Sequence, residues 1–188
     1  MNLIYQPKGK AREYADLALN IYDGCDHACT YCYAPRILHK TQEQFEQPRP
    51  RYGPRGYSPT LGDRIAWLDE LDRCAATFVR PKNVNQVLLC FTCDPYQSLD
   101  VDLQLTREAI KILHRHDFTV CILTKGGSRA LRDLDLFTPA DAFATTLTCV
   151  APATSQKWEP GAADPWDRIH TLRKFYDAGI PTWVSMEP

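Results

Sequence analysis

Three cysteines, Cys25, Cys29 and Cys32, lie within eight residues of one another. Spacings of three and then two intervening residues let three sulfur atoms reach one compact metal site from a single loop. Thiolates are soft ligands, so zinc and an iron–sulfur cluster are the two candidates for such a site. The fold therefore has to hold this loop in a conformation that keeps the three side chains close together.

The number of ligands separates the candidates. A structural zinc site has four protein ligands, and His27 is the nearest residue that could be the fourth. A cubane cluster held by three cysteines instead leaves one iron without a protein ligand, which is the open position that a reaction requires. Thiols that bind nothing are the third alternative. The pattern favours the cluster, and the sequence leaves the other two readings open.

The remaining cysteines are scattered through segments that resemble strands or helices, where a thiol packs as a small hydrophobic group. They are Cys74, Cys90, Cys93, Cys121 and Cys149. The N-terminus has no apolar signal region, and no run of about 18 apolar residues occurs. We therefore expect a cytoplasmic protein with no membrane segment, whose thiols stay reduced instead of forming a disulfide framework.

Short apolar runs alternate with helical periodicity, a pattern typical of parallel βα units. The expected strands are residues 17–22, 87–92, 120–124, 142–150 and 181–186. Thr106 and Ser128 are expected to cap two of the helices, and a third begins at Asp164 with Pro165 in its first turn and ends at Gly179. In this third helix the residues expected to face the core are Ile169, Leu172, Phe175 and Tyr176.

Residues 36–80 form an insertion between the cysteine loop and the second strand. Its first part, 36–57, contains five basic and two acidic residues, a local charge of +3, and its prolines and glycines predict a long loop. A helix follows, with one apolar face made by Leu61, Ile65, Leu68, Leu71, Cys74, Ala75 and Phe78. Tyr52 and Tyr57 are candidates for stacking on nucleic-acid bases.

The cysteine spacing after a first strand, with an aromatic residue before the third cysteine, resembles the radical S-adenosylmethionine (SAM) superfamily. Further matching segments are Thr92–Gln97, Leu123–Lys125, Leu131–Asp133 and Glu159–Gly161 with Arg168. Together with Tyr14–Ala34 they are similar to radical SAM proteins of the spore photoproduct lyase type. The resemblance implies an α/β fold, a partial (βα)6-type TIM barrel that fills residues 1–188 as one domain and stops after its fifth strand.

The resemblance also implies a chemistry. Members of this superfamily bind SAM at the open iron of a 4Fe–4S cluster and cleave it by one-electron reduction, and the resulting radical abstracts a hydrogen atom from substrate. The cofactors carry this chemistry, while the protein orients them and excludes competing reactions. Cys25, Cys29 and Cys32 would hold the cluster, and the enzyme would take its electron from a donor such as flavodoxin or ferredoxin.

Several other residues receive roles from the resemblance. Tyr31 and Tyr33 match tyrosines implicated in hydrogen-atom relay, with aromatic packing around the cluster as the alternative, and Lys125 matches a partner of the SAM carboxylate. Tyr31 is also assigned to SAM. Asp94, Tyr96 and Gln97, on the loop that leaves the second strand, could contact SAM or close the mouth of the barrel. Thr146 and Thr148 occupy alternate positions on a predicted strand, so we expect both to face one way, toward the ribose or methionine of SAM. Asp94 could equally cap the turn into Pro95. Glu159 and Arg168 could form a structural ion pair.

One departure concerns the cysteine that returns a hydrogen atom to the product radical in the lyases. The aligned position holds Phe91, and Cys90 and Cys93 are out of register, which argues against photoproduct repair itself. Cys93 is the candidate for this role. The end of the chain after the fifth strand leaves a barrel edge that a partner or a further C-terminal segment would close.

The net charge of −1 gives no general attraction to nucleic acid, so such affinity has to come from the basic loop. We consider three hypotheses: a radical enzyme acting on nucleic acid, a radical enzyme acting on a protein or small molecule, and a zinc-stabilised binding module without enzymatic activity.

Overall fold

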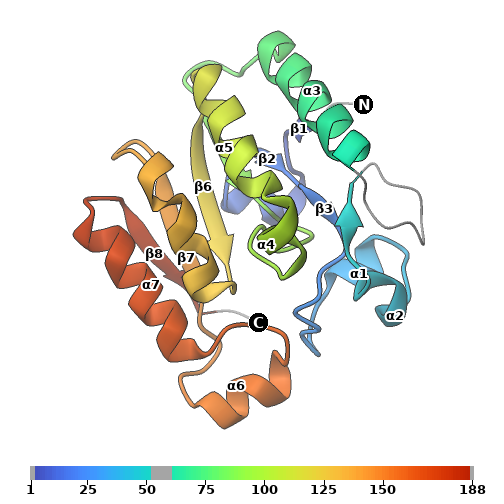
Figure 1. The fold of residues 1–188 in the computed structure, drawn as a ribbon, viewed down its shortest axis with the longest axis vertical. Helices are drawn as coiled ribbons and strands as arrows, with labels where there is room; N and C mark the ends of the chain where they lie inside the picture. Colours follow the sequence, from blue (N-terminus) through green and yellow to red (C-terminus); the bar gives the residue numbers. More distant parts are fainter. Residues whose placement is uncertain (1–2, 52–60, 187–188) are drawn as a thin grey trace.

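The computed structural model describes residues 3–51 and 61–186, and its main feature is a six-stranded sheet (Figure 1). The strand order is β1-β2-β5-β6-β7-β8. The strands are β1 (Ile4–Tyr5), β2 (Leu17–Leu19), β5 (Gln86–Leu89), β6 (Thr119–Thr124), β7 (Ala142–Thr146) and β8 (Thr182–Ser185). The last five run parallel to their neighbours, as expected from the sequence, and β1 pairs antiparallel with β2 at the edge.

Helices cover one face of this sheet (Figure 1). They are α3 (Leu61–Thr77), α5 (Leu105–Arg115), the 3-10 helix η2 (Gly127–Leu136) and α7 (Pro165–Asp177). Side chains alternate between the two faces, because Val87 and Leu89 join the main core under the helices, while Leu88 packs on the opposite face with Ala18 and Cys121. Since parallel strands end at the same edge, the loops after β2, β5, β6 and β7 all emerge together.

The helix α7 begins and ends as predicted. The Asp164 side chain accepts a hydrogen bond from the Trp166 amide at 2.8 Å, with Pro165 at the first helical position. Gly179, with φ +81°, follows the C-cap. Placing Tyr176 in the core was wrong, since it is 61% exposed. Phe175 already occupies the buried stripe, and its neighbour along the helix points about 100° away from it.

Two predicted helix caps were also wrong. Thr106 lies inside α5, where its amide donates to Asp100 Oδ1 at 3.0 Å, and a short helix α4 (Leu99–Leu103) precedes it. Gln104, with φ 49°, separates the two helices. Ser128 lies within η2 and bonds Asp167 through its own amide, so it caps nothing.

The segment after the cysteine loop is more structured than predicted. It holds α1 (Ala34–Ile37), α2 (Gln42–Phe45) and β4 (Arg49–Pro50), and β4 pairs with β3 (Tyr22–Asp23), which precedes the loop. The 3-10 helix η1 (Gly9–Glu13) lies earlier in the chain, between β1 and β2. Asp23 accepts hydrogen bonds from Lys40 and Arg49, at 2.5 and 2.6 Å. Of the apolar face predicted for α3, Ile65 is 49% exposed, because the buried stripe instead runs through Trp67, Leu71 and Ala75. Tyr52 and Tyr57 lie outside the described residues.

No helix in the described part of the chain is long and apolar enough to cross a membrane.

Candidate cofactor site at the carboxyl ends of the strands

The cysteine loop begins where β3 ends and is fixed at its first residue. The Cys25 amide donates to the Phe45 carbonyl at 2.9 Å. Gly24, with φ +114°, has no room for a side chain, because a Cβ would lie 2.5 Å from the same carbonyl oxygen. The Cys32 amide donates to the Cys29 carbonyl at 3.0 Å, which closes a turn between the second and third cysteines.

The three thiols differ in their surroundings. Cys29 is buried, while Cys25 and Cys32 are partly exposed. Burial raises the pKa of the Cys29 thiol to about 11, against the opposing charge of Lys125. Burial and the Asp94 carboxylate both raise the pKa of Cys25. Among residues 3–51 and 61–186, no three His, Cys, Asp or Glu side chains are already arranged as a metal site.

His27 does not serve as a fourth ligand in this arrangement. Its side chain is buried, its Nδ1 lies 3.4 Å from Asp94 Oδ2, and its Nε2 lies 3.3 Å from the Arg129 guanidinium. Arginine only donates, so Nε2 accepts and the ring proton sits on Nδ1, facing Asp94. Both ring nitrogens are therefore occupied, so His27 is not available to complete a zinc tetrahedron with the three sulfur ligands. The three thiols fit an iron–sulfur cluster in donor type.

Asp94 joins the loop after β5 to the end of β6. Its Oδ1 accepts from the Tyr96 amide at 2.8 Å and the Thr124 hydroxyl at 2.6 Å, and its Oδ2 accepts from the Lys125 amide at 2.7 Å. Burial would raise the pKa of Asp94, but His27 and these hydrogen bonds bring it below its usual range. The bond to the Tyr96 amide is the contact expected for the turn-capping alternative, and the three bonds together occupy both carboxylate oxygens.

Lys125 lies beside the cysteine loop. Its Nζ is 5.7 Å from the centre of the Tyr31 ring, a cation–π distance. Its charge acts to lower the pKa of Cys29 and of Cys32, although burial raises both. The structure thus brings Lys125 close to the cysteine loop, so residues that the resemblance had assigned to the site from two separate segments lie together.

Glu159 is a buried carboxylate that contacts Tyr31 of the cysteine loop and side chains that follow β7. Glu159 Oε1 accepts hydrogen bonds from the Tyr31 hydroxyl and, at 3.0 Å, from the Thr148 hydroxyl. Glu159 Oε2 lies 2.7 Å from the Arg168 guanidinium, and the side chains of both are fully buried. Burial would raise the pKa of Glu159, but the Tyr31 hydrogen bond and the Arg168 charge lower it. The ion pair was considered from sequence, whereas the link from Glu159 to Tyr31 was not.

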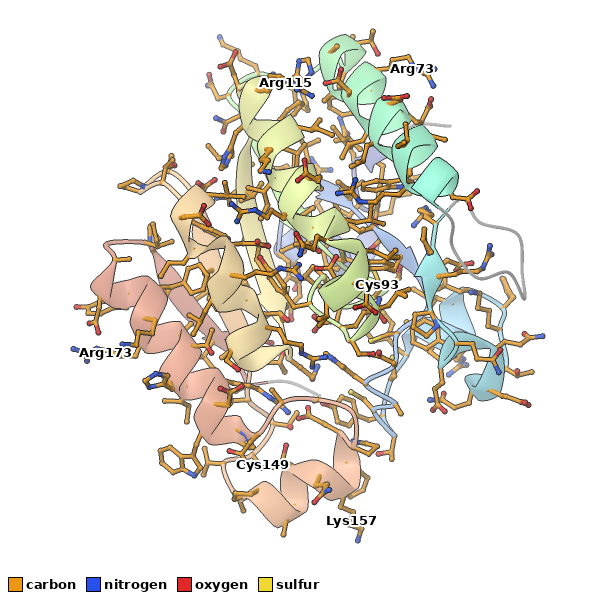
Figure 2. The ribbon with its side chains drawn as sticks, viewed as in Figure 1. Arg73, Cys93, Arg115, Cys149, Lys157 and Arg173 are labelled. Atoms are coloured by element: carbon orange, nitrogen blue, oxygen red, sulfur yellow. The ribbon has the colours of Figure 1, made fainter. Side chains whose placement is uncertain are left out.

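The remaining predicted residues are more scattered. The Tyr33 hydroxyl donates to the Phe91 carbonyl at 3.1 Å, and its side chain is largely exposed. Thr146, the last residue of β7, is buried, and its carbonyl accepts from Arg168 at 3.0 Å. Thr148 lies beyond the end of β7, so the strand alternation expected to align it with Thr146 does not apply. Cys93, labelled in Figure 2, is partly exposed and lies near Cys90.

The sequence matches the Radical SAM superfamily over residues 19–186. This chain belongs to the radical SAM superfamily. An uncharacterized protein of Methanocaldococcus jannaschii is 26% identical over 177 residues, which cover 93% of this chain and 60% of that protein. A structure of spore photoproduct lyase complexed with dinucleoside spore photoproduct matches with a TM-score of 0.69 and 18% identity, over 95% of this chain and 47% of the lyase chain.

A second lyase structure, of a mutant with bound AdoMet and dinucleoside spore photoproduct, matches with the same TM-score of 0.69. The radical SAM chain described here thus spans about half the length of the solved lyases and 60% of the archaeal relative. The predicted family and α/β fold are confirmed. The predicted cofactors, a 4Fe–4S cluster and SAM, are those of the family. The assignment of individual residues to them stays a prediction.

Proposed function

We propose that Cys25, Cys29 and Cys32 bind a 4Fe–4S cluster and that this radical SAM protein cleaves SAM reductively to start radical chemistry on a substrate. The observation that carries the proposal is the set of three loop thiols beside a histidine, His27, whose two ring nitrogens are held by Asp94 and Arg129. A metal site built from these residues keeps an open coordination position, which a structural zinc site does not have.

The protein's own groups have separable tasks in this proposal. Lys125 provides a cation for the SAM carboxylate, since an ammonium pairs strongly with a carboxylate in a partly dry site. Glu159 holds the Tyr31 ring in place beneath that cation. When bound, cluster and SAM together supply the one-electron cleavage that the side chains alone do not provide. Roles for Tyr33 and Cys93 in hydrogen transfer, and contacts from Asp94, Thr146 and Thr148 to SAM, remain predictions.

The direct test is anaerobic reconstitution with iron and sulfide, followed by reduction in the presence of SAM. We expect a brown protein that contains about four irons per chain and forms 5′-deoxyadenosine. A colourless protein with one zinc per chain and no sulfide would instead support the binding-module hypothesis. Dithionite can replace the biological donor, for which a flavodoxin or ferredoxin is the expected class.

Lys125→Met tests the assigned contact with SAM. Methionine keeps the length of the side chain but removes its charge, so we expect the SAM concentration at half-maximal rate to rise by about tenfold or more, the value of one charge-assisted hydrogen bond. Lys157→Met is the matched control, because Lys157 is exposed and lies over Trp158 on α6 (Pro152–Trp158; Figure 2). Equal SAM dependence in both variants would contradict the assignment.

A nucleic acid is the first substrate class to test. Spore photoproduct lyase, whose fold this chain shares, was solved with a dinucleoside photoproduct. Of the basic residues in 36–57, however, Lys40 and Arg49 are paired with Asp23, which leaves a smaller free charge than the sequence suggests. If DNA is the substrate, binding of a fluorescent single strand should weaken steeply between about 50 and 200 mM salt. Absent or salt-independent binding favours a protein or small-molecule substrate.

A further inference from the structure

Gln97 is a fully buried side chain in the loop after β5, and it contacts the cysteine loop. Its Oε1 accepts a hydrogen bond from the Asp26 amide at 3.2 Å, and its Nε2 donates to the Gly24 carbonyl at 3.3 Å. The two backbone groups flank Cys25. Because an amide N–H only donates and a carbonyl only accepts, the two partners together fix which way the Gln97 amide points.

Other contacts of the same loop strengthen this attachment. The Ser98 amide donates to Asp26 Oδ2 at 3.0 Å, and the Ser98 hydroxyl also contacts that oxygen. Asp94, three residues before Gln97 in the same loop, faces His27. The segment 94–98 therefore contacts the cysteine loop on both sides of Cys25.

The opposite side of the cysteine loop is held differently, by backbone groups. The Gly161 amide donates to the His27 carbonyl and the Thr30 amide donates to the Trp158 carbonyl, both at 2.9 Å. A Cβ on Gly161 would lie 2.2 Å from the Asp26 carbonyl oxygen, so the two backbones are in direct contact. Side-chain replacement leaves these backbone bonds in place. Around Cys25, by contrast, a single side chain supplies both a donor and an acceptor.

We infer that Gln97 is a positioning residue that sets the backbone of Cys25 and thereby the retention of the cluster. This inference rests on the proposed function, since it assigns Gln97 to the cluster site. Without the Gln97 amide, the Gly24 carbonyl and Asp26 amide lose their buried partners and the loop has to move to satisfy them. Cys25 then leaves the position in which its sulfur meets the same cluster as Cys29 and Cys32.

The test compares Gln97→Met with Asn20→Leu. Methionine fills a similar volume without hydrogen-bonding like an amide. Asn20 is also a buried amide, but it bonds the Phe91 and Thr92 amides instead of the cysteine loop, so it controls for the general loss of a buried amide. Each protein is reconstituted with iron and sulfide, and cluster loss to a chelator is followed by absorbance near 400 nm, without SAM. Thermal unfolding of the metal-free proteins measures any general destabilisation.

We expect Gln97→Met to lose its cluster about tenfold faster than wild type or more, because the substitution removes two buried hydrogen bonds and one alone is worth roughly that factor. Asn20→Leu should lose it at the wild-type rate even if its melting temperature falls as far. Equal rates for Gln97→Met and wild type, or equal acceleration in both variants, would overturn the inference. If Gln97→Met does not fold, Ser98→Ala, which removes only the hydroxyl contact to Asp26, should show a smaller acceleration, and an unchanged rate would overturn the inference in that case. Failure of wild type to take up any cluster would instead overturn the proposed function.

Discussion

Replacing Cys29 with alanine is expected to abolish the formation of 5′-deoxyadenosine from SAM. Cys29 is the most buried of the three loop cysteines, and its carbonyl holds the turn that leads to Cys32. Alanine keeps that backbone contact and removes only the sulfur. With two thiolates left, a second iron loses its protein ligand and the cluster is no longer held in the loop. The measurement is 5′-deoxyadenosine by mass spectrometry after anaerobic reduction, together with iron and sulfide per chain.

Cys74→Ala is the matched control for this experiment. Cys74 lies on α3, where it packs against the core and its sulfur is 3.6 Å from Glu70 Oε1, so the substitution removes a thiol without touching the cysteine loop. It should leave both the iron content and the product yield at wild-type levels. Full turnover by Cys29→Ala, or an equal loss in Cys74→Ala, would show that this loop does not bind the reactive cluster.

The parallel sheet could be predicted from sequence because its strands are continuous apolar runs. The prediction for β6 missed only its first residue. The carboxyl ends of β2 and β5 were harder to predict from sequence, because a tertiary contact determines where these strands end. Asn20 Oδ1 accepts from the Phe91 and Thr92 amides at 2.8 and 3.0 Å, and thereby replaces the strand ladder at the carboxyl end of both strands. In the sequence, a single polar side chain inside an apolar run does not indicate that the strand ends there. The edge strand β1 is only two residues long and carries too little pattern to be recognised.

The candidate site likewise combines residues that could be predicted from local sequence with contacts that only the tertiary fold creates. Lys125 directly follows a predicted strand, and the loop of the three cysteines comes after another, so their places near the strand ends could be expected from local spacing and from resemblance. The Glu159 contact with Tyr31 joins residues 128 positions apart and depends on how the chain folds back after β7. Gln97 was expected from the sequence to contact SAM or to close the mouth of the barrel. Its actual partners are backbone groups, which carry no sequence signature.

Replacing Arg168 with leucine is expected to destabilise the metal-free protein by about 3–5 kcal/mol, because a buried carboxylate is left without its counter-ion. In a protein of this size that corresponds to a fall in melting temperature of roughly 10 °C. Arg168 also donates to the Ala163 and Thr146 carbonyls at 2.7 and 3.0 Å, so its removal loosens the segment that carries Glu159. Thermal and denaturant unfolding of wild type and variant give the difference directly.

The double variant Arg168→Leu with Glu159→Leu separates the charge from the packing. Removing both partners leaves no unpaired buried charge, so it should be more stable than Arg168→Leu alone. The pH dependence gives a second check. In wild type the pKa of Glu159 is lowered, so the stability it contributes is present at neutral pH and is lost as pH falls through that pKa. In Arg168→Leu the lowering effect of the Arg168 charge is lost, so the pKa of Glu159 rises relative to wild type. Protonation then costs the variant less stability than it costs wild type, and the deficit of the variant should shrink as pH falls below about 4.5, the usual glutamate value. A deficit that stays constant over this range, with no recovery in the double variant, would mean that Arg168 acts through its carbonyl contacts and that Glu159 holds Tyr31 without needing a counter-ion.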